Sequence, residues 1–98
     1  MQVGKLFRVV ISAYSERKAV ELVQVSFVPP GDDDDAGLVN VMSVEGKMAN
    51  GDVFLCLGQK RLNWESHYLY LLFYEKVWST NETVENLAKL RCTFEEIV

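Results

Sequence analysis

Apolar and polar side chains alternate over the first part of the chain, which is the pattern of strands with one buried face. Lys5 to Tyr14 and Ala19 to Val28 both show this alternation, and a short loop around Arg17 separates them. Pairing the two segments as a hairpin makes their apolar faces coincide. The expected register pairs Phe7 with Phe27, Val9 with Val25 and Ile11 with Val23.

The segment after the first strand also allows a short helix. Ser15 would cap a helix over Glu16 to Val23, in which Ala19, Val20 and Val23 have helical spacing. The order would then be strand, helix and strand. We favour the hairpin, because the valines in this region are β-branched and no helix stop separates Val23 from the second strand.

A second hairpin is predicted around Asn50 and Gly51. This dipeptide is the strongest short signal for a two-residue turn in which both residues have positive φ. Leu38 to Met48 and Val53 to Leu57 flank the turn, and a hairpin brings their apolar positions to one face. The expected pairs are Met48 with Val53, Gly46 with Leu55 and Val44 with Leu57.

The last part of the chain predicts a long strand followed by a helix. Glu65 to Trp78 has two largely apolar faces, which is typical of a central strand or of one at an interface. Ser79 and Glu82 resemble a capping box, so we expect a short helix near residues 80–91. The residues that this helix would bury are Val84, Leu87, Ala88 and Leu90. We expect the tail from Thr93 to Val98 to be an edge strand or a docked extension.

These elements predict one α+β domain, mostly β, over residues 1–98. We expect a twisted antiparallel sheet of about five strands, able to curl into a half-barrel and packed against one C-terminal helix. We expect residues 29–37 to form a flexible acidic loop. The chain has 14 acidic and 10 basic residues, and the loop's four aspartates, Asp32, Asp33, Asp34 and Asp35, account for the whole excess.

The sequence contains no pattern that marks a metal site or a cofactor site. The acidic loop fails the calcium-loop spacing, because a loop starting at Asp32 has Ala36 at position 5 and Ser43 at position 12. A solvated loop is the simpler interpretation, and we expect no cofactor. Cys56 and Cys92 are expected to be buried thiols. The absence of a leader or a spanning segment predicts a cytoplasmic protein.

Catalytic residue sets are equally absent from the sequence. His67 is the single histidine, and the neighbouring Ser66 would point to the opposite face of a strand. We therefore expect His67 to be structural or exposed, and the protein not to be an enzyme.

Aromatic residues gather in the predicted strand over 65–78, where they favour an interaction surface. The residues expected to bind a partner are Tyr68, Tyr70, Tyr74, Trp78, Lys60, Arg61, Trp64 and the four aspartates of the loop. We expect a small protein-binding module, such as a virus- or phage-encoded accessory or inhibitor protein. The alternative is a single-stranded nucleic-acid binder in which the tyrosines stack on bases beside Lys60 and Arg61. The two apolar faces of the long strand also predict a homodimer.

Overall fold

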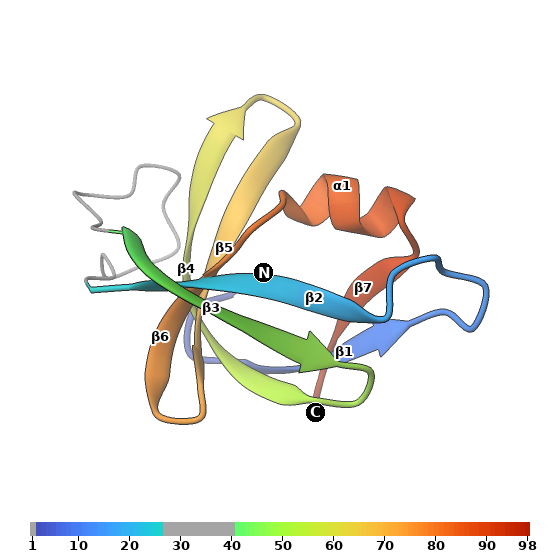
Figure 1. Cartoon of the computed structure of the whole chain (residues 1–98), viewed down its shortest axis with the longest axis horizontal. Helices are drawn as coiled ribbons and strands as arrows, with labels where there is room; N and C mark the ends of the chain where they lie inside the picture. The colour runs from blue at the N-terminus through green and yellow to red at the C-terminus, as the bar shows by residue number, and fades with distance from the viewer. Residues whose placement is uncertain (1, 27–40) are drawn as a thin grey trace.

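The computed structural model describes residues 2–26 and 41–98, and within these ranges seven strands form one antiparallel sheet with a single helix. The elements are β1 (Leu6–Ile11), β2 (Ala19–Val25), β3 (Val41–Ala49), β4 (Val53–Asn63), β5 (Ser66–Phe73), β6 (Lys76–Thr80), α1 (Val84–Lys89) and β7 (Cys92–Glu96). Their order in the sheet is β3-β2-β6-β5-β4-β1-β7. The sheet curls into a half-barrel, and α1 packs against β5 and β7 (Figure 1). The predicted class is confirmed, with seven strands in place of about five.

The core fills the inner face of the curled sheet. Alternation places Leu69 and Leu71 of β5 on this face, together with Val20 and Leu22 of β2. Leu87 brings the helix onto the same cluster, where it is fully buried. The two cysteines, Cys56 and Cys92, belong to this cluster as buried free thiols, as predicted.

The first two strands do not pair with each other, so the predicted hairpin over Lys5 to Val28 is wrong. β1 lies between β4 and β7, whereas β2 lies between β3 and β6. The short helix is wrong as well, because residues 12–18 form turns and bends. Alternating apolar residues decide which face of a strand is buried, but not which strand lies beside it. Val9 therefore faces Phe94 and Ile11 faces Cys92, while Phe27 lies outside the described residues.

The turn at Asn50 and Gly51 is tight, yet the strands that it joins do not pair. Only Gly51 has a positive φ, at 93°, and the amide of Asp52 donates to the carbonyl of Ala49 at 3.1 Å. Positive φ at the second turn residue alone belongs to a type II turn, whose twist splays the flanking strands. The backbone of Val9 in β1 bonds to the turn instead. Its carbonyl accepts from the amide of Gly51, and its amide donates to the carbonyl of Asp52, at 2.8 Å each. The predicted pairs Met48 with Val53, Gly46 with Leu55 and Val44 with Leu57 are therefore wrong.

The predicted long strand from Glu65 to Trp78 is two strands, β5 and β6, joined by a turn. Tyr74 and Glu75 both have positive φ, at 50° and 62°, which is the geometry that reverses a hairpin in two residues. Asparagine and glycine usually supply this geometry, so neither residue signals a turn in the sequence. The reversal places Trp78 opposite Leu71.

The helix is shorter than predicted. Thr83 caps it, since its hydroxyl accepts from the amide of Asn86 at 3.2 Å. Ser79 belongs to β6, so the predicted cap at Ser79 is wrong. Of the residues expected to be buried, Leu87 is buried, Val84 and Leu90 are half-buried and Ala88 is exposed. The tail forms β7, which confirms the edge strand.

Candidate functional site

β4 and β5 continue beyond the rest of the sheet as a projecting hairpin (Figure 1). Residues 60–65, called here the hairpin tip, are all exposed. Trp64 is 92% exposed and Leu62 is 58% exposed. Tryptophan is largely buried in most proteins, because its ring is the largest apolar side-chain surface. The hairpin tip therefore presents an apolar surface to solvent, away from the core.

The backbone of the hairpin tip is held in one geometry. The side-chain oxygen of Asn63 accepts from the amide of Glu65 and from the hydroxyl of Ser66, each at 2.9 Å. Such a side-chain bond to a backbone amide two residues on fixes a tight turn. Trp64 lies between the two ends of this bond, so its main chain is ordered before any partner binds.

A carboxylate from the helix holds the hairpin next to its tip. Glu85 Oε1 accepts from the amide of His67 at 2.7 Å, and Glu85 Oε2 lies 2.7 Å from Nδ1 of the same histidine. The other ring nitrogen, Nε2, is buried and has no hydrogen-bond partner within residues 2–26 and 41–98. The hydroxyl of Ser66 donates to Asn63 and not to this ring. These contacts position the hairpin against α1, and no pair of nucleophile and base is formed here.

A groove of about 490 Å³ separates the hairpin from α1. Leu62 and Tyr68 line it on the hairpin side, and Glu82, Glu85 and Lys89 line it on the other side. The exposed apolar side chains of the hairpin tip thus border a mainly polar groove.

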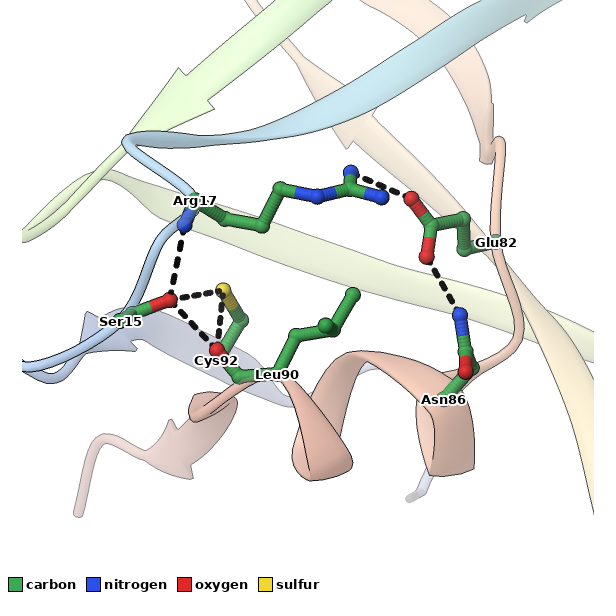
Figure 2. A network of polar contacts seen from close by, with 6 residues as sticks. All are labelled: Ser15, Arg17, Glu82, Asn86, Leu90 and Cys92. Atoms are coloured by element: carbon green, nitrogen blue, oxygen red, sulfur yellow. Dashed lines mark hydrogen bonds and ion pairs between the residues drawn. The ribbon is translucent and has the colours of Figure 1, made fainter.

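The helix is tied at both ends to the loop between β1 and β2 (Figure 2). The Ser15 hydroxyl donates to the carbonyl of Leu90 and accepts from the amide of Arg17 at 3.0 Å. The guanidinium of Arg17 pairs with Glu82, which also accepts from the side-chain amide of Asn86 at 2.5 Å. These bonds hold α1, which forms the other side of the groove, in place.

The structure separates the aromatic residues that were expected to act together. Tyr68 is half-buried and lies opposite Lys60 of β4. Tyr70 is only 3% exposed, and burial raises the pKa of its phenol. Tyr74 is exposed in the turn at the other end of β5. Trp78 is buried against the core, and its indole nitrogen donates to a backbone carbonyl at 3.0 Å.

The three predicted residues that precede β5 lie on the hairpin. Lys60, Arg61 and Trp64 all belong to the hairpin tip, and Arg61 lies opposite His67. Asp32, Asp33, Asp34 and Asp35 lie outside the described residues. Leu62 is a site residue that the sequence analysis missed. A leucine two residues from Trp64 in an otherwise polar stretch could have indicated an exposed apolar surface.

In the described part of the chain, no helix is long and apolar enough to cross a membrane, and no group of three or more metal-ligating side chains is present. No protein-family model matches the chain, and no curated protein or solved structure is significantly similar to it. A function for this protein therefore rests on its own geometry.

Proposed function

We propose that this chain is a small, non-enzymatic binding module that docks on a partner protein through the hairpin tip. The observation that carries the proposal is Trp64, which is 92% exposed on a turn whose backbone Asn63 fixes. Tryptophan is among the residues that most often dominate binding energy at interfaces. A turn that is ordered in advance loses little conformational entropy when it binds.

The surroundings of Trp64 indicate the chemistry of the partner. Leu62 enlarges the apolar surface, while Lys60 and Arg61 are exposed on the same hairpin tip. The partner should therefore offer an apolar pocket with carboxylates at its rim. A projecting hairpin that fills such a pocket also blocks it, which supports an accessory or inhibitor role.

Single-stranded nucleic-acid binding has less support as an alternative. Base stacking needs several exposed aromatic rings along a positive groove. Of the three tyrosines assigned to this role, Tyr70 is buried and Tyr74 lies at the far end of β5. Tyr68 with Lys60 opposite it is what supports this alternative.

Affinity capture with matched variants tests the proposal. The tagged full chain is expressed in cells, and bound material is identified with and without nuclease treatment. We expect a protein partner that survives nuclease, and we expect Trp64→Ala to weaken binding to that purified partner by about 30-fold or more. Tyr14→Ala is the control, because Tyr14 is an equally exposed aromatic residue, at 84%, outside the hairpin.

Two results would contradict the proposal. Loss of all bound material after nuclease treatment would favour the nucleic-acid alternative. A purified partner that binds the Trp64→Ala variant as tightly as the unchanged chain would exclude the hairpin tip as the docking site.

The homodimer stays a part of the proposal, on a different surface from the one first expected. β3 is an end strand of the sheet and exposes Val41, Met42 and Val44. Unpaired edges of this kind can pair with a second copy of the same chain. We expect a dimeric mass by light scattering at micromolar concentration, and a monomeric mass for Val44→Lys. A monomeric mass for the unchanged chain would contradict the predicted homodimer.

A further inference from the structure

β3 carries two opposite charges on the outer face of its free edge. Among the described strands β3 has a single neighbour, β2, so its other edge is unpaired. Gly46 faces the core, because a Cβ there would meet the ring of Trp78. The residues on either side, Glu45 and Lys47, therefore point outwards, and both are exposed. Neither makes an ion pair within the described part of the chain, so both charges are available to a strand that adds to this edge.

The regular part of β3 is its second half. From Glu45 to Ala49 the strand pairs residue for residue with β2. Before Glu45 the register shifts, and β3 has the three residues 42–44 where β2 has Gln24 alone. A bulge of this kind bends a strand and interrupts its ladder. A strand that adds to β3 should therefore be centred on the second half and not on the bulge.

A second copy of β3 fits this edge best in one register. Directly opposite residues of an antiparallel pair lie on the same face, so the charges of the two copies can meet. With Gly46 on the twofold axis, Glu45 lies opposite Lys47 of the second copy, and this contact occurs twice. With Glu45 or Lys47 on the axis, two like charges lie opposite each other. With Val44 on the axis, neither charge meets another and the axis falls within the bulge.

The register centred on Gly46 also joins apolar side chains on the inner face. Val44 lies opposite Met48 of the second copy, again twice. Val44 is 43% exposed, whereas Met48 is fully buried in the core. Pairing would therefore place the exposed surface of Val44 beside the core of the second copy, where cross-strand apolar contacts stabilise a sheet.

We propose that β3 pairs with β3 of a second copy in the register that places Gly46 on the twofold axis, and that Glu45 and Lys47 select this register. The inference rests on the proposed homodimer, to which it adds the register and the residues that determine it. Opposite charges across two strands stabilise their pairing, and like charges destabilise it. The two contacts between Glu45 and Lys47 thus favour this register over those shifted by one residue to either side.

Charge reversal tests the register. Glu45→Lys replaces both opposite-charge contacts by like-charge contacts, and so does Lys47→Glu. We expect each variant alone to weaken the dimer about tenfold or more, measured as its dissociation constant by sedimentation equilibrium. An equimolar mixture of the two variants should recover a dimeric mass, because each contact then joins opposite charges again. No register with another residue of β3 on the axis produces this combination of results.

Controls separate the register from net charge and from misfolding. Glu16→Lys and Lys18→Glu make the same changes in net charge at exposed residues of the loop between β1 and β2, and should leave the dissociation constant unchanged. Lys47 lies opposite Glu21 of β2, so circular dichroism checks that Lys47→Glu is folded. Glu45 lies opposite an uncharged residue of β2, so Glu45→Lys adds no like charge within the chain and tests the register by itself.

The outcomes keep the register apart from the rest of the proposed function. A dimer that is equally tight for Glu45→Lys and the unchanged chain would overturn the register and leave the homodimer standing. A monomeric unchanged chain would overturn both. Trp64→Ala, which tests docking through the hairpin tip, should leave the dissociation constant of the dimer unchanged. Loss of the dimer in Trp64→Ala would place the interface on the hairpin and overturn the inference.

Discussion

Glu85 holds His67 at two points, with one carboxylate oxygen on the backbone amide and the other on the ring nitrogen Nδ1, each at 2.7 Å. This contact joins the first turn of α1 to the projecting hairpin next to its tip. It therefore fixes the width of the groove that lies between them.

Replacing the carboxylate of Glu85 should weaken the contact between α1 and the hairpin. We expect Glu85→Ala to lower the free energy of unfolding by about 1–2 kcal/mol, because two hydrogen bonds to a partly exposed charged group are lost. Urea denaturation at neutral pH measures the change. Glu95→Ala is the control, since Glu95 pairs with Arg8 at 3.5 Å on an open surface, and such pairs contribute about 0–1 kcal/mol. Equal losses in the two variants would show that the Glu85 contact adds nothing specific.

Burial of Tyr70 makes stability depend on alkaline pH. Burial raises the pKa of its phenol above the usual 10.0, because the phenolate would lose its hydration. The unfolded chain releases this proton near its usual pKa while the folded chain keeps it. The contribution of Tyr70 is thus complete below about pH 10 and is lost as the pH rises further.

We expect Tyr70→Phe to lose less unfolding free energy than the unchanged chain between about pH 9 and about pH 11. Urea denaturation at several pH values measures this difference. Tyr14→Phe, at an exposed site, should follow the unchanged chain. Parallel pH curves for Tyr70→Phe and the unchanged chain would contradict the prediction.

The indole ring of Trp78 lies where a side chain at residue 46 would project, and Gly46 has none. A Cβ at this position would lie 2.8 Å from Cη2 and 2.9 Å from Cζ3 of the ring, closer than carbon atoms can approach. The ring cannot easily move, because it is buried and its nitrogen donates to Phe73. We expect Gly46→Ala to cost about 1–3 kcal/mol of stability. In a double-mutant cycle the cost should shrink on a Trp78→Phe background, and an unchanged cost there would rule out this contact as its cause.

Ser15 ties the loop before β2 to the end of α1. Ser15→Ala would leave the amide of Arg17 without its side-chain partner and the carbonyl of Leu90 with only the weak thiol donor of Cys92, at 3.7 Å, in a half-buried region. We expect a cost of about 1–3 kcal/mol. We expect the backbone amides of α1 to exchange with deuterium faster in this variant. Ser12→Ala is the control, because Ser12 makes one exposed bond, to the amide of Tyr14 at 3.2 Å. Unchanged exchange in Ser15→Ala would contradict the role given to this hydroxyl.

The sequence predicted the class of the fold because alternation is a local property. Val9, Val20 and Leu69 are buried, as strand residues facing a core should be. Strand partners are not local, and both predicted hairpins failed for this reason. The bond between the Val9 backbone and Gly51 separates β3 from β4, and nothing near Gly51 in the sequence indicates it.

The candidate site was only partly predictable for a related reason. Trp64 and Lys60 could be found because aromatic and basic residues cluster before the predicted strand. The turn at Tyr74 and Glu75 has no glycine or asparagine, so the reversal that moves Trp78 to the core could not be seen.

The position of β1 in the sheet has a consequence for how the chain folds. β1 is made early in synthesis, yet its two neighbours are β4 and β7, and the register with β7 pairs Phe7 with Glu96. The strand can therefore pair with β4 only once Val53 to Leu55 are made, and with β7 only once Cys92 to Glu96 are made. Contacts between such distant residues close large loops, which slows folding in comparison with sheets built from successive hairpins. We expect refolding to be slow for a chain of this size, with β1 and β7 gaining protection last.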